Sequence, residues 1–174
     1  RIVILPVDGP DEALAPDTEG LIAVHRSDPG LMLGYWNRAA EQAEVTRGDW
    51  FVGGDLGTMD ADGYITHTGR NNEVMKALGY RVSPLEVEAV LAAHPDIAEV
   101  ACAELAVRAD VHIVGAFVVL KESAARDADA ILAFAAERLA AYKCPREIRF
   151  VDALPRTANG KVKRAALATL APSA

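Results

Sequence analysis

Cysteine, clustered histidine and long apolar runs are all scarce in this sequence, and each shortage excludes a class of protein. Its 174 residues include only two cysteines, Cys102 and Cys144, and no Cys-x-x-Cys pair, which leaves no disulfide framework. The four histidines lack metal-ligand spacing. No apolar run is long enough to cross a bilayer, and no signal-peptide pattern opens the chain. We therefore expect a cytoplasmic protein without a metal, a disulfide or a membrane span.

Positive charge is also scarce. Lys and Arg number 18 against 25 Asp and Glu, which gives a net charge of −7. A nucleic-acid surface needs clustered Lys and Arg, so nucleic acid is excluded as a partner. Hydrophobic residues make up 51% of the chain, enough for one domain or two small ones. Because the first residue is Arg1 rather than Met, we expect the chain to start inside a longer protein.

Short strands dominate the first third of the sequence. Apolar runs predict strands at residues 1–5 and 21–25, and residues 51–69 predict two strand segments around the turn at 60–63. Residues 34–45 have the composition of a short helix.

The second part mixes helices and strands. A hairpin turned at Gly79 and a helix capped by Ser83, with Glu86 completing a capping box, come first. Cys102, in a strand-like run, is expected to be a buried small hydrophobe. The remaining pattern predicts strands at 97–105, 112–120 and 147–151, a loop at 154–164, and a helix over 128–142 with Ile131, Phe134, Leu139 and Tyr142 as core positions.

This mixture without strict alternation favours the α+β class. We place a boundary near Arg70–Asn72. It separates a β-rich part from a small α+β domain.

Three segments carry side chains suited to chemistry. Lys161 follows the turn-forming pair Asn159-Gly160 and could bring a positive charge to a carboxylate or phosphate oxygen; the alternative is a solvated basic tail. Asp55 follows two glycines and suits a ribose diol, although a turn aspartate bonding its own backbone has the same pattern. Arg70 could bind a ribose or phosphate, or form a surface salt bridge.

The order of these segments is more specific than any one of them. The chain contains, in sequence, GYWNR, WFVGGDLG, DGYITHTGR, GYRVSPLEVE and LPRTANGK. This series resembles the adenylate-forming superfamily, which includes acyl-CoA and aryl-CoA synthetases and the adenylation domains of peptide synthetases. The resemblance runs from about residue 20 to residue 167.

The resemblance implies a two-step reaction and a mobile small domain. Enzymes of this family join a carboxylic acid to ATP, with Mg²⁺, to give an acyl-adenylate and pyrophosphate, and then transfer the acyl group to a thiol, usually that of CoA. Residues 1–69 would be the β-rich end of the large domain, residues 70–73 the hinge, and residues 74–174 the small domain. The small domain would then rotate between the two steps about the hinge at Asn72.

The same resemblance assigns roles residue by residue. Lys161 matches the catalytic lysine of adenylation, and Asp55 and Arg70 match residues that bind the ribose of ATP. The loop of the thioester step would comprise Lys76, Gly79, Tyr80 and Arg81. No metal ligand is assigned in this chain.

This sequence departs from the family pattern at three places. Asn72 replaces the usual Asp or Lys of the hinge, Gly53 replaces the threonine of Thr-Gly-Asp, and Leu78 replaces the first glycine of the swinging hairpin. The last two changes bear on the nucleotide site and on the thiol channel.

Several parts that the family needs are missing from this sequence. Neither the phosphate loop ending in Pro-Lys nor the Tyr-Gly-x-Thr-Glu segment is present. The acid pocket would also lie in an N-terminal portion of the same enzyme, so alkyl, aryl and amino acids all stay open. We expect the chain to be inactive alone.

Two alternatives stay open beside an acyl-CoA ligase. One is the end of a peptide synthetase adenylation domain, which acylates a carrier protein. The other is a non-catalytic regulatory module.

Overall fold

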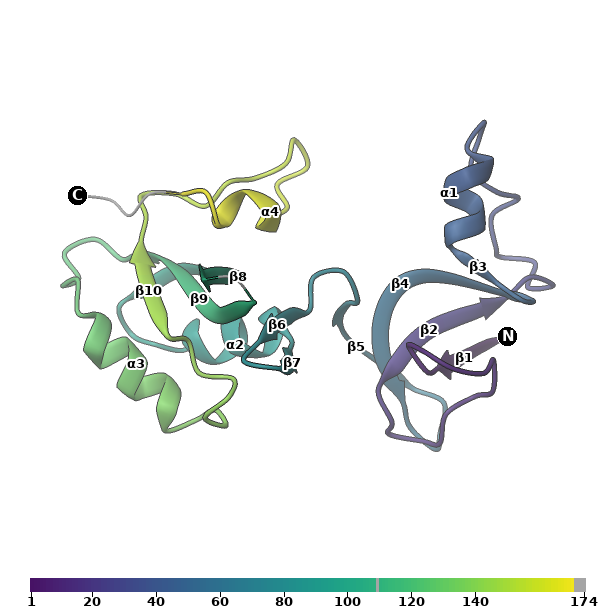
Figure 1. Ribbon diagram of the computed structural model, residues 1–174, viewed down its shortest axis with the longest axis horizontal. Coiled ribbons are helices and arrows are strands. Elements are labelled where there is room, and N and C mark those ends of the chain that lie inside the picture. The colour runs from purple at the N-terminus through teal and green to yellow at the C-terminus, as the bar shows by residue number, and fades with distance from the viewer. Residues whose placement is uncertain (109, 171–174) are drawn as a thin grey trace. The chain divides into compact units, whose positions relative to one another are not determined.

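The computed structural model describes residues 1–108 and 110–170. Over these residues the chain is rich in strands and has few, short helices. It divides into two compact units, the first from Arg1 to Asn72 and the second beginning at Glu73, whose elements are labelled in Figure 1. In the part of the chain that the structure describes, no helix is both long and apolar enough to cross a membrane.

The first unit is built on one antiparallel sheet. Its longest strand is β4 (Trp50–Met59), which pairs along one edge with β2 (Gly20–His25), and β2 in turn pairs with β1 (Ile2–Leu5). The other edge of β4 is shared by β3 (Thr46–Arg47) and β5 (Ile65–Arg70). These strands include all the segments that the apolar runs predict.

The first unit has a small core and a helix that contributes nothing to it. Buried apolar side chains come from β1, β2 and β4, namely Ile4, Leu5, Leu21, Ala23 and Leu56. The helix α1 (Ala39–Glu44) has no buried residue. It begins five residues later than residues 34–45 predict, because Gly34 and Asn37 take positive φ values of 142° and 53°, which a right-handed helix does not allow.

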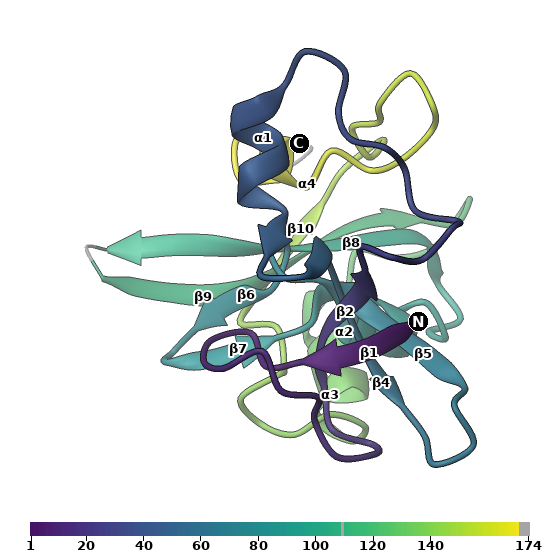
Figure 2. The ribbon, with the colours of Figure 1, turned by 90° about the vertical axis from the view of Figure 1, so that its right-hand side faces the viewer.

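The second unit is organised by a three-stranded sheet. β8 (Ile97–Arg108) and β9 (Val111–Leu120) form an antiparallel hairpin, and β10 (Glu147–Phe150) pairs in parallel with the other edge of β9. Figure 2 shows β8 and β9 side by side. Side chains of β8 and β9 are buried on both faces of this sheet, which explains why apolar residues occupy consecutive positions in both strands.

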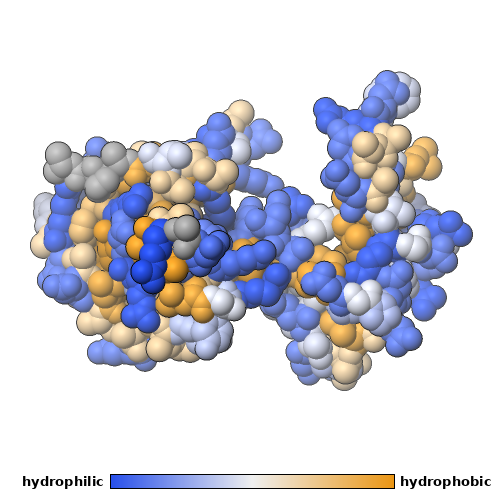
Figure 3. All heavy atoms as spheres, viewed as in Figure 1, coloured by the Kyte–Doolittle hydropathy of each residue, from blue (hydrophilic) through white to orange (hydrophobic). Residues whose placement is uncertain are grey.

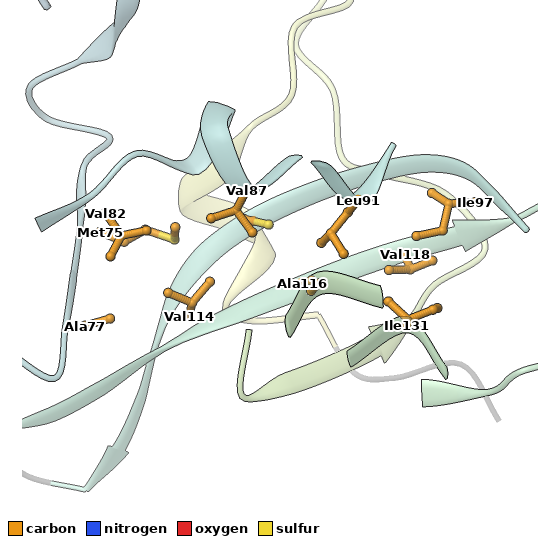
Figure 4. Close-up of a cluster of buried hydrophobic side chains, with 12 residues drawn as sticks. Met75, Ala77, Val82, Val87, Leu91, Ile97, Val114, Ala116, Val118 and Ile131 are labelled. Carbon is orange, nitrogen blue, oxygen red and sulfur yellow. The ribbon is translucent and has the colours of Figure 1, made fainter. Parts of the chain in front are cut away.

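Each face of this sheet has its own core. On the helix face, α2 (Pro84–Leu91), α3 (Ala128–Ala136) and the hairpin of β6 (Met75–Ala77) and β7 (Tyr80–Val82) cover Cys102, Val114, Ala116 and Val118 (Figure 4). On the loop face, α4 (Arg164–Leu167) and residues 151–162 cover Ala101, Ala103, Leu105 and Phe117. Figure 1 shows α2 and α3 on one side of the sheet and α4 on the other.

Ser83 stands at the predicted N-cap position of α2, but the predicted capping box does not form. Pro84 does occupy the first turn, but the Ser83 side chain makes no capping hydrogen bond with the helix. The Glu86 carboxylate instead accepts a hydrogen bond at 2.6 Å from the Lys143 ammonium, because a full opposite charge is a stronger partner than a backbone N–H. α2 ends at Leu91, three residues before the predicted end at His94.

The helix predicted over 128–142 is also too long. α3 ends at Ala136, and Tyr142 lies outside it with 36% of its surface exposed, so Tyr142 is not a core residue. Ile131 is buried, and the Phe134 ring is covered by the His94 ring and by the Arg138 guanidinium.

Cys102 is fully buried, which confirms its interpretation as a small core side chain. Burial, together with the nearby Glu88 carboxylate, raises the pKa of its thiol well above the usual value. The thiol is therefore held in its neutral, unreactive form.

Candidate functional site

Asp55 and Arg70 form a pair across two strands of the first unit. The register of β4 and β5 places them opposite each other, and Arg70 Nε lies 3.3 Å from Asp55 Oδ1. Arg70 Nη2 also donates a hydrogen bond at 2.7 Å to the Gly53 carbonyl. Each side chain is about half exposed, at 47% for Asp55 and 48% for Arg70. The pair can therefore offer an acceptor and a donor to a hydroxyl-bearing ligand from solvent.

His67 joins this pair, although no sequence pattern predicted it. Its Nε2 lies 3.6 Å from Asp55 Oδ1. In a regular strand, residues three apart such as His67 and Arg70 point to opposite faces. The pairing of β4 with β5 shifts register between Leu56 and Gly57, and this irregularity brings both side chains to Asp55. No pattern in the sequence marks that shift.

Lys161 lies on a closed hairpin rather than on an open loop. Arg156 and Val162 form a bridge at its base, and Thr157 N donates to the Lys161 carbonyl at 2.7 Å. Lys161 N donates in return to Thr157 Oγ1 at 3.1 Å. Gly160 takes a φ of 81°, which favours glycine at the tip. The Lys161 side chain is exposed. The hairpin therefore presents a solvent-accessible ammonium group on a backbone that hydrogen bonds hold in place.

Arg156 ties this hairpin to the sheet. Its Nη1 donates at 2.7 Å to the carbonyl of Gly160, the residue before Lys161. Its Nη2 donates at 2.5 Å to the Glu99 carboxylate on β8. One guanidinium therefore connects the tip of the hairpin to a regular strand.

Arg164 anchors the end of the same segment. The interpretation of residues 161–164 as a solvated basic tail does not hold for this residue, because its side chain is only 17% exposed. Both of its terminal nitrogens donate to the Glu88 carboxylate on α2, and its Nε donates at 2.9 Å to Glu73. Burial opposes the charge, but the hydrogen bonds and attraction of Glu88 and Glu73 outweigh burial, so the pKa of Arg164 is raised.

The predicted thioester loop is a tight two-strand hairpin in the second unit. Lys76 and Arg81 lie opposite each other in the register of β6 and β7, and both are exposed. Gly79 forms the turn with a φ of 85°, and Leu78 before it has a φ of 51°. Tyr80 is 53% exposed.

Two contacts with β8 and β9 hold the backbone of this hairpin. Lys76 N donates to the Glu104 carboxylate at 2.6 Å, and Leu78 N donates to the His112 carbonyl at 3.0 Å. The hairpin and the Lys161 segment belong to opposite faces of the sheet, because Met75, Ala77 and Val82 enter the core of the helix face whereas Leu154 and Val162 pack on the loop face.

The structure thus groups some predicted site residues and separates others. Asp55 and Arg70 are in contact within the first unit, and Lys76, Gly79, Tyr80 and Arg81 share one hairpin of the second. Asn72 is exposed and is the last residue of the first unit. Among residues 1–108 and 110–170, no three or more His, Cys, Asp or Glu side chains are grouped to hold a metal ion.

Comparison with known proteins gives a consistent set of relatives. Residues 86–161 match the family model of the AMP-binding enzyme C-terminal domain. A 2-succinylbenzoate–CoA ligase of Geobacillus kaustophilus is 41% identical over 91% of this chain and 32% of its own length. A long-chain-fatty-acid–CoA ligase of Bacillus subtilis is 40% identical over 88% of this chain and 27% of its own length.

Solved structures agree with these sequence relatives. O-succinylbenzoate coenzyme A synthetase from Bacillus subtilis in complex with AMP has a TM-score of 0.86 at 28% identity, covering 100% of this chain and 34% of its own. The same enzyme with ATP and magnesium ion has a TM-score of 0.83 at 30% identity, covering 96% of this chain and 33% of its own. The chain spans about a third of the length of the relatives it matches.

Proposed function

The chain belongs to the adenylate-forming superfamily, and from that membership we propose that it is the C-terminal part of an ATP-dependent acyl-CoA ligase. The reaction has two steps. A carboxylate oxygen first displaces pyrophosphate from ATP and forms an acyl-adenylate. The sulfur of CoA then attacks the acyl carbon, and AMP leaves as the thioester forms.

Lys161 serves the first step. Its ammonium bridges the substrate carboxylate and the phosphate of ATP, and so stabilises negative charge that develops in the transition state. The closed hairpin supports this role, since hydrogen bonds with Thr157 and Arg156 fix the backbone at Gly160 and at both the N–H and the carbonyl of Lys161 before substrate arrives. Preorganised charge is what makes such a group effective.

Asp55 and Arg70 bind the nucleotide. The exposed Asp55 carboxylate accepts hydrogen bonds from the two ribose hydroxyls, and Arg70 donates to the ribose from the opposite strand. Their mutual contact orients the carboxylate without blocking its solvent side. As the resemblance to the family implies, we assign magnesium to the N-terminal portion of the enzyme.

The observation that carries the proposal is the placement of two functional elements on opposite faces of one sheet. The Lys161 hairpin lies over the loop face, and the hairpin of Lys76, Gly79, Tyr80 and Arg81 lies over the helix face. A rigid domain built this way presents one element for adenylation and, after rotating, the other for thioester formation. The rotation would occur at Asn72.

A surface of the first unit supports partnership with an N-terminal portion. The loop before α1 exposes Leu33 completely and Trp36 at 88%, and α1 itself buries nothing. In Figure 3, apolar side chains lie beside polar ones over this region. Large apolar side chains exposed together mark an interaction surface, and we assign this one to the remaining part of the same enzyme.

Substitution of Lys161 tests the proposal directly. In the full-length enzyme, Lys161→Ala lowers the rate of ATP–pyrophosphate exchange by about 10²–10³, the usual effect of removing one preorganised donor. Lys163→Ala, which removes an exposed lysine two residues away, leaves exchange unchanged. Circular dichroism and thermal unfolding check that both variants fold. Unchanged exchange in Lys161→Ala would instead support a non-catalytic module.

The thiol substrate is tested separately. With CoA as the acceptor, the full-length enzyme forms an acyl-CoA thioester, which is measured by mass spectrometry. Acylation of a carrier protein, with no transfer to CoA, would identify a peptide synthetase adenylation domain instead.

A further inference from the structure

Tyr142 contacts the hairpin of β6 and β7, which holds the residues of the predicted thioester loop, without being part of it. Its ring stacks on that of Tyr80, with the ring centroids 4.6 Å apart and the planes inclined by 26°. Tyr142 follows α3 in the segment that leads to β10. Tyr80 lies directly after Gly79 at the tip of the hairpin. Two side chains 62 residues apart in the sequence are thus joined at the surface of the second unit.

The segment that carries Tyr142 is itself fixed. The next residue, Lys143, donates a hydrogen bond at 2.6 Å to Glu86 on α2, and its Nζ lies 5.6 Å from the centroid of the Tyr142 ring. The hydrogen bond to Glu86 raises the pKa of Lys143 despite its partial burial, so the ammonium stays charged at neutral pH. Tyr142 is therefore held in place by its neighbour, and the Tyr80 ring packs against it.

The two strands of the hairpin are held in different ways. β6 is held through its backbone, by the bonds from Lys76 N to Glu104 and from Leu78 N to the His112 carbonyl. At the tip side of β7, the stack with Tyr142 holds the Tyr80 side chain, which is otherwise 53% exposed. A stacked pair of aromatic rings stabilises its arrangement beyond the burial of the two rings.

We propose that Tyr142 is a positioning residue for thioester formation, acting through Tyr80. Its ring keeps Tyr80, and with it the turn at Leu78 and Gly79, in the conformation that meets the incoming thiol. This inference rests on the proposed function of the hairpin. It concerns the second step alone, because Lys161 and its hairpin belong to the opposite face of the sheet.

The test uses the full-length enzyme and measures both steps. Tyr142→Ala lowers kcat/KM for CoA about threefold to tenfold, the range expected for loss of an aromatic stack, and leaves ATP–pyrophosphate exchange unchanged. Tyr142→Phe keeps the ring and restores thioester formation. Tyr64→Ala, which removes a tyrosine 75% exposed between β4 and β5 of the first unit, changes neither step.

Three results would overturn the inference. Unchanged thioester formation in Tyr142→Ala would show that the stack has no role. Equal losses in both steps would show a general role in folding, and a Phe variant as impaired as the Ala variant would assign the effect to the hydroxyl. Absence of ATP–pyrophosphate exchange in the unsubstituted enzyme is a different outcome, since it would refute the proposed function itself.

Discussion

At the scale of single residues, Arg164 closes the exposed edge of a sheet. β8 is an edge strand, and the backbone of Cys102 on it donates its N–H to Glu88 and accepts a hydrogen bond from Arg164 through its carbonyl. Glu88 and Arg164 also pair with each other, and their side chains are only 15% and 17% exposed. The ion pair therefore supplies hydrogen-bond partners for a backbone N–H and a carbonyl that would otherwise be unpaired at the edge of the sheet.

Removal of this guanidinium should be costly. Arg164→Met keeps the apolar stem but leaves Glu88 and Glu73 without their shared positive charge, so the free energy of unfolding falls by about 3 kcal/mol, as for other partly buried pairs that lose one member. Urea denaturation measures the loss. Lys163→Met removes an exposed charge next to it and should change stability by no more than about 0.5 kcal/mol. Equal effects of the two substitutions would contradict this account.

At the scale of elements, the turn between β6 and β7 contains two residues that differ in how well they tolerate a positive φ. Leu78 and Gly79 both have positive φ, of 51° and 85°, which is the conformation of a type I′ turn. Glycine adopts it freely, whereas a leucine is strained by about 1–2 kcal/mol. The family pattern has glycine at both positions, so this chain carries the strain where the family does not.

Substitution at this turn should therefore stabilise the protein. Leu78→Asn places a residue that tolerates positive φ at the first turn position, and because Leu78 is 49% exposed little apolar contact is lost. We expect the urea midpoint of the second unit to rise, equivalent to about 1 kcal/mol. Gly79→Ala introduces strain at the next position and should lower the midpoint by a similar amount. A lower midpoint for Leu78→Asn would refute the strain argument.

At the scale of the whole molecule, the junction between the two units is short. Asn71 N donates at 2.8 Å to the carbonyl of Gly54 in the first unit, and the second unit begins two residues later at Glu73. Asn72 lies between the hydrogen-bonded Asn71 and the first residue of the second unit. A rotation of the small domain would have to occur in the backbone dihedral angles of very few residues.

Proline at this position should separate the two steps of the reaction. Asn72→Pro fixes one dihedral angle and restricts the residue before it, so we expect acyl transfer to CoA to be slowed more than ATP–pyrophosphate exchange. Asn72→Ala, which leaves the backbone free, should support both steps. Single-turnover measurements of each step make the comparison. Equal loss of both in the proline variant would indicate misfolding.

The sequence predicted those strands and turns whose pattern lies within a few consecutive residues. The apolar runs of β8 and β9 show strands because those residues are buried on both faces, and Gly79 and Gly160 mark turns through their backbone freedom. The motifs also placed the chain in its family, because short segments such as LPRTANGK need no knowledge of what surrounds them.

Other features depended on residues far apart in the sequence. Glu86 pairs with Lys143 rather than capping α2, Tyr142 stacks on Tyr80 rather than entering the core, and Arg164 is enclosed by Glu73 and Glu88. Periodicity along the chain cannot show such partners, since it reports only which face of an element is apolar.

By itself, the sequence determined the family and the main strands, and it pointed to residues that could take part in a reaction, because each of these signals lies in a few consecutive positions. Only the tertiary structure decided that the hairpin of Lys161 and the hairpin of Tyr80 lie on opposite faces of one sheet, and that His67 joins Asp55. The physical reason is that strand register and side-chain pairing depend on packing between segments that lie far apart in the sequence.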